Sequence, residues 1–482
     1  MLTAQSAKNL VSIMLGFGIG AVNTLVLYPH FFGAANQGLV VFLLSASNLL
    51  MPLIGFGVSQ TMIKFYSSYE KSAQQNFLSF IVVLPLIVAV PISFIVLYFH
   101  DAIAALLSVE NPIIATYTWV IFAVAFATAY FEIFYSWARV HFKSVTGNIL
   151  KEIYPRLSVL VLLLLYAIKF LDLDLFFVML VGLYYLRLVM MMLIAFRIKK
   201  PSWSFRLPHN VPELLRYSLF LVLAASAGSL IIDIDKFMLP QYKSIDQTAF
   251  YSVAIFTAAL IDVPGRAMFQ ILNPIIAKTL NENNKAQLNI LYKNSSINLL
   301  LLGGWFFLLV NASINSLFDL MKNQGYGEAV LVVLMISFAK LVTMSSGASN
   351  TLLINSKKYH VSLLLTIFMS FFVVFGNYLL IPIYGINGAA LSTLIVVVAF
   401  TFIRMGYVYA YLGLQPYDMK TLIAFLVIGL VFGASYFIDW EIHPISSIVL
   451  KSILVTLVYA ILVAALNLSD KVNLWIKRFL SR

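Results

Sequence analysis

The chain has 482 residues, of which 62% are apolar and 10% are charged. Soluble proteins average about 45–50% apolar and about 25% charged residues. This composition excludes a disordered chain, a secreted domain and a nucleic-acid-binding regulator, and it indicates a polytopic membrane protein. The net charge is +12 and cysteine is absent. The absence of cysteine excludes a disulfide framework, a thiol nucleophile and a Cys-ligated metal.

A bilayer core about 30 Å thick requires about 20 apolar residues per spanning helix. The sequence predicts fourteen such spans, at 8–27, 38–58, 77–99, 113–133, 153–170, 174–196, 214–234, 249–269, 296–314, 327–347, 361–383, 387–410, 420–438 and 445–466. The 153–170 stretch is the shortest. The first stretch is too long for a signal peptide and lacks a cleavage site of small residues, so we expect it to remain as a helix.

The distribution of Lys and Arg predicts the orientation, because cytoplasmic connections are rich in these residues. With the N-terminus inside, 23 of the 31 Lys and Arg residues fall on inside segments and 4 on outside segments. This asymmetry favours an even number of spans with both termini in the cytoplasm. It also explains the positive net charge without a nucleic-acid partner.

The longest polar connections divide the chain. The segment Arg197–Pro212 is basic, contains three prolines and follows the sixth expected span. We therefore expect an N-terminal six-helix lobe at 1–200, a linker and C-terminal six-helix lobe at 201–412, and a final helix pair with a cytoplasmic tail at 413–482. Transporters often consist of two such repeats with the site between them. The predicted fold is an all-α membrane protein with two lobes around a central cavity.

Ionisable residues within the spans are functional candidates, because a charge in the bilayer is unfavourable. Arg187 and Lys340 each lie thirteen residues into their spans, about 20 Å from the outer edge for Arg187. They belong to opposite lobes and, facing one cavity, would bind an anion. The alternatives are an arginine that pairs with a distant acid or extends toward the inner surface, and two independent structural charges.

Three further candidates for coupling or gating lie near the outer end of the seventh expected span and within the eighth. Asp262 and Arg266 are spaced i,i+4, which places them on one helix face where they can pair. This pattern fits a structural salt bridge or a site for gating or ion coupling, with Arg266 also a candidate for substrate binding. Asp235 and Lys236, next to Asp233, fit an outer gate or a solvated helix end.

Other polar residues have both a functional and a structural interpretation. Lys64 and Arg404 lie near inner span ends, where they either extend to the interface or line the entrance for an anionic head group. Gly16 and Gly20 form a close-packing motif. A polar stripe faces a cavity or forms interhelical hydrogen bonds, and it consists of Asn23, Thr24, Ser45, Ser47 and Asn48. No phosphate-binding loop or metal-ligand spacing is present, so neither a metal nor a cofactor is expected.

The sequence resembles the polysaccharide-transporter branch of the multidrug/oligosaccharidyl-lipid/polysaccharide exporter superfamily, which includes Wzx-type O-antigen flippases. The resemblance rests on the fourteen expected spans, on Asn9-Leu10-Val11 with Gly16 and Gly20, and on the segment from Asp235-Lys236 to Tyr251, with Pro274 beyond it. Family members often have a glycine two residues before the tyrosine, where this chain has Ala249.

The resemblance implies a flippase of the bacterial inner membrane rather than an enzyme. Its substrate would be an undecaprenyl-pyrophosphate-linked oligosaccharide used for surface polysaccharide, and its cavity would be lined by Arg187, Lys340 and Arg266, with Lys64 and Arg404 at the entrance. Membrane lipids, a coupling ion such as H⁺ or Na⁺, and a glycan polymerase or glycosyltransferase are the expected partners.

Three alternatives remain open at this point. A cation-coupled multidrug exporter of the same superfamily would be expected to use an acidic residue in its cavity, and here the first span has no carboxylate. A lipid II flippase differs in its substrate. A membrane-bound glycan polymerase or glycosyltransferase would need polar groups on a sizeable outside loop, and the expected outside turns are short.

Overall fold

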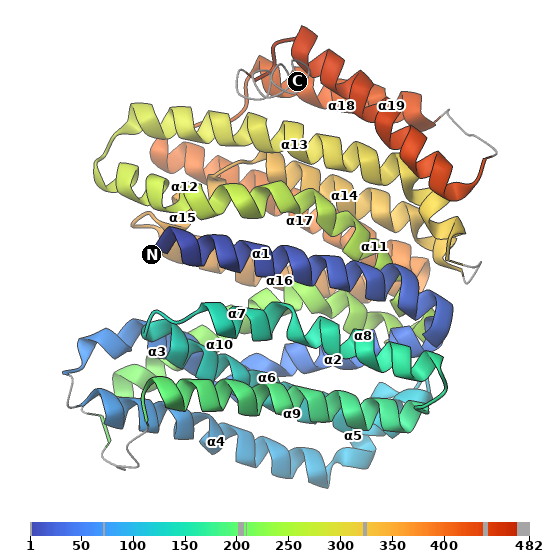
Figure 1. Cartoon of the computed structure of the whole chain (residues 1–482). Coiled ribbons are helices and arrows are strands. Elements are labelled where there is room, and N and C mark those ends of the chain that lie inside the picture. Colours follow the sequence, from blue (N-terminus) through green and yellow to red (C-terminus); the bar gives the residue numbers. More distant parts are fainter. Residues whose placement is uncertain are drawn as a thin grey trace. The chain divides into compact units, whose positions relative to one another are not determined.

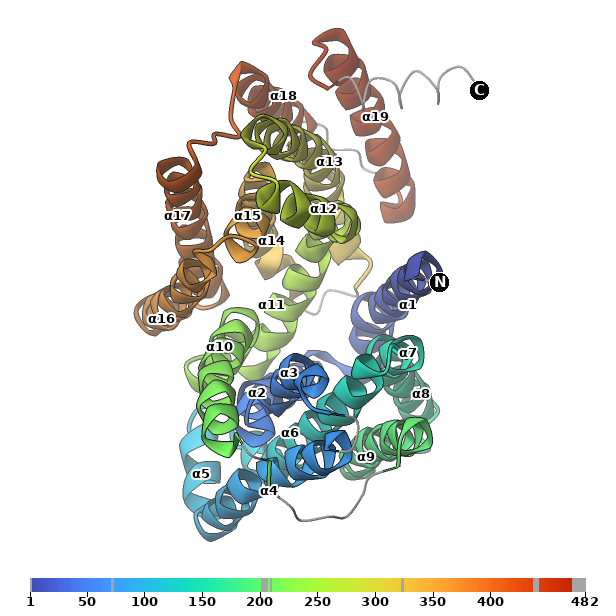
Figure 2. The same ribbon diagram turned by 90° about the vertical axis from the view of Figure 1, so that its left-hand side faces the viewer.

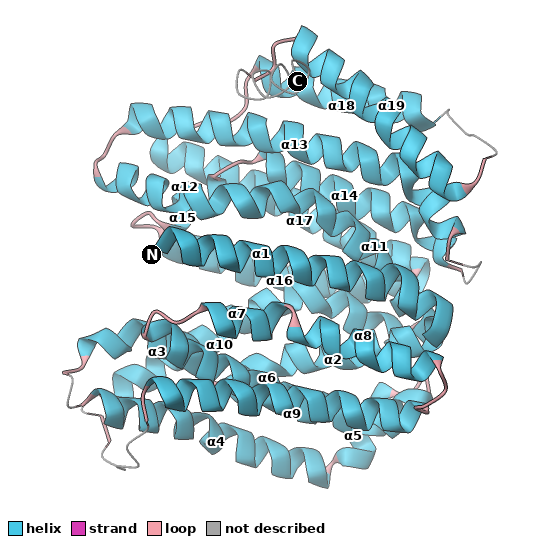
Figure 3. Ribbon diagram, viewed as in Figure 1, coloured by secondary structure: helices cyan, strands magenta, loops and turns pink. Residues whose placement is uncertain are grey.

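The structure is a computed structural model that describes residues 2–70, 73–200, 207–208, 210–321, 325–436 and 442–469. These residues form helices joined by turns, with no strand in the described ranges (Figure 3). The predicted all-α fold is therefore confirmed. Internal contacts divide the chain into two compact units, Met1–Ala249 and Phe250–Arg482.

The first unit is organised around α6, which packs against α2, α3 and α9 (Figure 2). Trp137 and Phe131 of α6 have no exposed surface, which accounts for the central position of this helix. The helices from the N-terminus to the end of this unit (Figure 1) are α1 (Leu2–Ala21), the π-helix η1 (Val22–Phe32), α2 (Ala34–Gly55), α3 (Val58–Phe65), η2 (Tyr66–Ser68), α4 (Gln74–Tyr98), α5 (His100–Leu107), α6 (Ile113–Val140), α7 (Val145–Glu152), α8 (Tyr154–Ala167), α9 (Leu173–Ile198), α10 (Val211–Met238), η3 (Leu239–Gln241) and the start of α11 (Ile245–Ala258).

The second unit is organised around α13, a continuous helix of 35 residues that packs against α12, α14, α18 and α19. At 1.5 Å per residue it is about 52 Å long, well above the thickness of the hydrocarbon core. The remaining helices of this unit are η4 (Ala259–Asp262), α12 (Val263–Asn281), α13 (Lys285–Asp319), η5 (Tyr326–Ala329), α14 (Val330–Ser345), α15 (Ser349–Ile354), α16 (Tyr359–Tyr384), α17 (Ile386–Leu412), α18 (Met419–Tyr436) and α19 (Pro444–Ala465).

Twelve helical segments of the described residues are long and apolar enough to cross a membrane, and they correspond to twelve of the fourteen expected spans. The other two expected spans are shorter helices. The stretch 153–170 forms α8, which has 14 residues and is about 21 Å long, and 420–438 forms α18. The count of fourteen is therefore not confirmed, although each expected segment contains a helix in its described residues.

Two expected spans are interrupted, and each interruption has a local cause. Phe56 and Gly57 separate α2 from α3 and have φ values of 46° and 63°. Gly57 suits this left-handed backbone, and a Cβ there would lie 2.5 Å from the Ser218 carbonyl oxygen of α10. The eighth span is interrupted by η4 just before Pro264, which cannot donate a backbone hydrogen bond. Side chains on either side of such an interruption do not keep the relative positions that the spacing of a regular helix predicts.

The outward faces of α4 and α16 are strongly exposed apolar surfaces, one in each unit. Only 22% of the most apolar 18-residue stretch of each helix is buried. The exposed side chains include Phe94 and Leu97 of α4 and Phe371 and Phe375 of α16. Because lipid tails are as apolar as these side chains, such faces are stable in a bilayer. The chain is a multi-pass membrane protein.

The expected lobe boundaries differ from the division by contacts. The seventh expected span, α10, packs against α2 and α3 within the first unit, so that unit extends to Ala249 instead of residue 200. Residues 201–206 and 209 of the expected linker and residues 470–482 of the expected tail lie outside the described residues. The division into two lobes and a final pair stays a prediction.

Candidate functional site

Arg187 lies near the middle of α9, and it is 5% exposed. Its guanidinium carbon is 4.3 Å from the ring centroid of Phe131 and 4.8 Å from that of Tyr184. Nη2 donates to Thr128 Oγ1 at 3.3 Å, and Nε has no hydrogen-bond partner. Within the described ranges no carboxylate forms an ion pair with it. Arg187 is thus a buried cation packed between aromatic rings.

Further charged residues lie on α6, α7 and α8 and are linked to Arg187 or to one another by contacts. Together they form the α6–α9 charge cluster, which consists of Glu132 and Arg139 of α6, Lys151 and Glu152 of α7, Arg156 of α8, and Arg187 of α9. Glu132 interacts electrostatically with Arg187. It also forms an ion pair with Lys151, whose Nζ is 2.7 Å from Glu132 Oε1. Four cations face two carboxylates in this cluster, so it carries a surplus of positive charge.

The cluster is only partly shielded from its surroundings. The Lys151 and Arg156 side chains are 42% and 36% exposed, and Glu152 pairs with Arg156 at 3.0 Å. Helix α1 lies against α7 and α8, where a Cβ at Gly16 would be 2.6 Å from Arg156 Nη1. Asn23 donates to the Arg156 carbonyl oxygen at 2.7 Å. The close packing expected at Gly16 is therefore confirmed.

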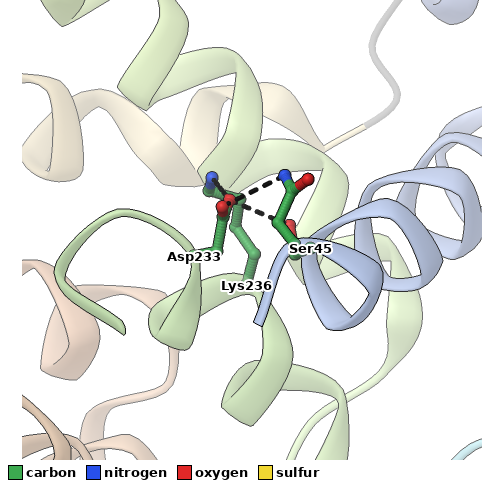
Figure 4. Close-up of polar contacts among 4 residues, drawn as sticks. Ser45, Asp233 and Lys236 are labelled. Atoms are coloured by element: carbon green, nitrogen blue, oxygen red, sulfur yellow. Dashed lines mark hydrogen bonds and ion pairs between the residues drawn. The ribbon is translucent and has the colours of Figure 1, made fainter. Parts of the chain in front are cut away.

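A second polar contact joins α2 to α10 (Figure 4). The Asp233 carboxylate accepts hydrogen bonds from Ser45 Oγ at 3.3 Å and from Asn48 Nδ2 at 3.2 Å, and it pairs with Lys236 Nζ at 2.6 Å. Lys236 therefore pairs with Asp233, whereas Asp235 is buried at 4% exposure. At Ser45 and Asn48 the expected polar stripe therefore forms interhelical hydrogen bonds, which is the second of the two interpretations of this stripe.

In the second unit, Asp262 forms an ion pair with Lys340 of α14. The pairing of Asp262 with Arg266 allowed by the i,i+4 spacing is wrong, since no ion pair joins these two described residues. The reason is the helix interruption. Asp262 ends η4, while Arg266 lies beyond Pro264 on α12 and is exposed. Lys340 is therefore compensated by an acid, unlike Arg187.

The remaining candidates lie apart from these pairs. Lys64 is exposed, with its Nζ 3.7 Å from the ring centroid of Tyr217. Arg404 is half-buried, its Nε has no hydrogen-bond partner, and it interacts electrostatically with Tyr292. Arg187 and Lys340 belong to different units. The expectation that all five cations line one cavity stays a prediction.

Two features of the sites concern residues outside the membrane-spanning segments. Tyr417, between α17 and α18, has its hydroxyl 2.6 Å from Ser345 Oγ, and burial raises the pKa of this tyrosine above its ordinary value. Lys151 and Glu152 of α7 belong to the charge cluster, and they lie between two expected spans, outside the candidates predicted from the sequence. The i,i+4 spacing of Glu152 and Arg156 was the available signal for this helical turn.

An apolar cavity of about 380 Å³ lies in the second unit between α13, α14, α17 and α18. Its lining includes Phe307, Leu334, Phe338, Leu394, Phe425 and Phe432. Within the described ranges, no group of three or more His, Asp or Glu side chains is arranged to hold a metal ion.

The fold is similar to that of two solved membrane proteins. The lipid II flippase MurJ in an inward closed conformation has a TM-score of 0.73, is 13% identical, and the similarity covers 96% of this chain and 99% of that chain. An inward-facing multidrug resistance MATE family transporter of the MOP superfamily has a TM-score of 0.65 and 16% identity, with 84% of this chain and 94% of that chain covered. At these identities the likeness establishes the fold alone.

Sequence relatives identify the family and confirm the resemblance seen in the sequence. The capsular polysaccharide biosynthesis protein CapF of Staphylococcus aureus is 22% identical over 180 residues, which are 37% of this chain and 46% of CapF. The match therefore spans about half the length of that relative. The family described as "Polysaccharide biosynthesis protein" matches residues 2–280, more than half of the chain, and the chain belongs to this family.

Proposed function

We propose that the protein translocates a lipid-linked oligosaccharide with an anionic pyrophosphate across the bacterial inner membrane, for surface polysaccharide biosynthesis. It acts as a carrier and not as an enzyme, with both termini in the cytoplasm. Membership in the polysaccharide biosynthesis family and the fold shared with a lipid II flippase support the proposal. The observation that carries it is the buried Arg187 with its unused hydrogen-bond donor.

Arg187 has the properties expected of a group that receives an anion. A buried charge is unfavourable unless it is compensated, and no carboxylate pairs with Arg187 within the described ranges. Its Nε–H is buried without an acceptor. A guanidinium forms strong, bidentate hydrogen bonds with phosphate oxygens. A pyrophosphate would supply both the missing charge and the missing acceptor.

The rest of the charge cluster provides a path toward Arg187. Arg139 and Lys151 both face the Tyr135 ring, and Lys151 and Arg156 are partly exposed. Tyr184 interacts electrostatically with Arg156 and Arg187, so these two cations share a neighbour. An incoming phosphate would meet the exposed cations first. Glu132 and Glu152 limit the positive charge, which favours release of the cargo.

The lipid tail requires a different environment from the pyrophosphate. The exposed apolar face of α4, with Phe94 and Leu97, is a surface of the first unit suited to contact with a hydrocarbon chain. We assign the tail to the surrounding bilayer. Alternating access, driven by H⁺, Na⁺ or the membrane potential, would then move the head group.

The proposal is tested by replacing Arg187 with alanine. Arg187→Ala should lower surface glycan at least about tenfold, the effect of losing one charge-assisted bond of about 1.5–3 kcal/mol, with protein abundance unchanged. Arg197→Ala is the matched control, since Arg197 is an exposed arginine on the same helix. Normal surface glycan in Arg187→Ala would contradict the proposed role.

A reconstituted assay identifies the cargo. Purified protein in vesicles is given a fluorescent undecaprenyl-pyrophosphate oligosaccharide, lipid II or a cationic dye, and transfer between the leaflets or efflux is measured. The proposal expects transfer of the oligosaccharide lipid and its loss in Arg187→Ala. Transfer of lipid II alone would assign the chain to that substrate, and dye efflux alone would favour a drug exporter.

A further inference from the structure

Asp233 of α10 accepts neutral hydrogen bonds from α2 and forms an ion pair within its own helix. The carboxylate is 7% exposed and has three donors, two from α2 and one from its own helix. The α2 donors, Ser45 Oγ and Asn48 Nδ2, are neutral. The cation is Lys236, three residues further along α10, at 2.6 Å.

This arrangement makes the contact with α2 separable. If α2 supplied the cation, its departure would leave an uncompensated carboxylate, which is strongly unfavourable in a buried site. Because Lys236 stays with Asp233, the departure of α2 removes only two neutral donors that water can replace. The ring of Phe42 on α2 stacks on Phe237 at 5.7 Å, one turn from these bonds, and apolar stacking is equally reversible.

Two further hydrogen bonds along α10 are also formed between neutral groups. Thr61 Oγ1 and Ser218 Oγ are 2.8 Å apart, and the Tyr69 hydroxyl donates to Asn210 Oδ1. These contacts join α3, and the turn that follows η2, to the first half of α10 and the residue before it. The one charge of α3 near them is Lys64, which is exposed and lies over the ring of Tyr217 at 3.7 Å. An exposed cation can be hydrated when this contact opens, so it does not hold the two helices together.

The far end of α10 is held differently. The side chain of Asn111, before α6, donates to the carbonyl oxygens of Pro240 at 2.7 Å and Lys243 at 2.9 Å, and it accepts from the Ile245 N–H at 2.9 Å. These three bonds fix the turn between α10 and α11 to the α6 end of the unit. Asn111 therefore holds the end of α10 in place, next to the Asp233 contact from which α2 can separate.

We infer that the Asp233 contact is a latch that opens and closes between α2 and α10 during transport. Lys236 neutralises the carboxylate in both positions, and Asn111 holds the turn about which α10 moves. The latch rests on the proposed function, since it is a step of the transport cycle. It assigns a role to Ser45, Asn48 and Asp233 that a static helix contact would not have.

The first experiment needs no cargo. The chain has no cysteine, so Phe42→Cys creates a unique thiol at a position with no exposed surface in the latched state. In purified full-length protein its maleimide labelling rate should rise about fivefold or more when Asp233→Asn is added, because the amide is a weaker acceptor and does not pair with Lys236. Asp174→Asn, which weakens the acceptor for Tyr117 at 2.6 Å, is the control and should leave the rate unchanged. An equal rate in Asp233→Asn would overturn the latch.

The second experiment tests whether separation of α2 from α10 is required for transport. Phe42→Cys/Phe237→Cys is cross-linked with a short, reducible bifunctional thiol reagent in cells. Surface glycan should fall at least about tenfold and return on reduction. The control pair, Phe134→Cys/Phe196→Cys, joins two rings 5.5 Å apart on α6 and α9 and should stay active when cross-linked. Transport that continues across the α2–α10 cross-link refutes the latch. A deletion strain with normal glycan would instead refute the proposed function, while the labelling result still reports on the latch.

Discussion

The guanidinium of Arg187 lies over the ring of Phe131, 4.3 Å from its centroid, at a point where an acid would be expected. An aromatic face stabilises a cation by roughly 0.5–2 kcal/mol, which is less than the desolvation of a buried guanidinium requires. On the proposed function, Arg187 is retained for binding the anion and not for stability, and this leads to the first prediction.

Arg187→Met should leave the melting temperature unchanged or raise it, while transport is lost. Methionine fills a similar volume between Phe131 and Tyr184 and has no charge to desolvate. The measurement is the melting temperature of detergent-purified protein beside the surface glycan of the same variant. A fall of several degrees would indicate that Arg187 stabilises the α6–α9 packing.

The pair of Asp262 and Lys340 should behave as a coupled unit. Its side chains are 23% and 24% exposed, between a surface pair and a buried one, so we expect a coupling energy of about 1–2 kcal/mol. Asp262→Asn and Lys340→Met should each destabilise the protein, and the double variant should lose less than the sum. Unfolding of all four proteins measures the coupling. Strict additivity would exclude an energetic role for the pair.

Gly57→Ala should destabilise the protein by about 1–2 kcal/mol or more, because an L-residue is strained at a positive φ. The new Cβ would also be forced against the Ser218 carbonyl oxygen of α10. Gly182→Ala is the control on α9, where a Cβ meets no atom within 4 Å. The control should be neutral or stabilising by up to about 1 kcal/mol. Thermal unfolding compares the two, and equal effects would contradict the close approach of α10.

Stability should decrease in alkali through Tyr417. Burial raises the pKa of this tyrosine in the folded protein above the ordinary value of about 10. Above about pH 10 the unfolded chain loses the proton first, so the free energy of unfolding falls as pH rises. Tyr417→Phe should reduce this slope, and Tyr359→Phe, which removes an exposed hydroxyl, is the control. Melting temperatures from pH 8 to pH 11 test the difference, and an unchanged slope in Tyr417→Phe would count against it.

The sequence was sufficient for the fold class, because apolar stretches of about 20 residues have few other stable conformations than helices in a membrane. It was less informative at the helix interruptions. The i,i+4 spacing of Asp262 and Arg266 assumes a regular helix, and the 3₁₀ turn before Pro264 removes that regularity. Lys340 then becomes the partner of Asp262, and a contact 78 residues away has no local signal.

The candidate site shows the same limit. Arg187 was identifiable from its depth in an apolar span, whereas its aromatic neighbours were not, since Phe131 lies on another helix. Lys151 and Arg156 were not among the candidates, because their contacts depend on how α7 and α8 pack near α6. Their place beside Glu132 and Tyr184 is a property of packing and not of spacing.

The length of α13 has a practical consequence for topology. A helix of about 52 Å exceeds the bilayer core by about 20 Å, which leaves enough length for the turn where α12 meets α13, around Asn283 with its φ of 52°, to lie outside the hydrocarbon core. All side chains from Asn281 to Gln287 are exposed there. An epitope inserted at this turn would report which compartment it faces while leaving both helical bundles untouched.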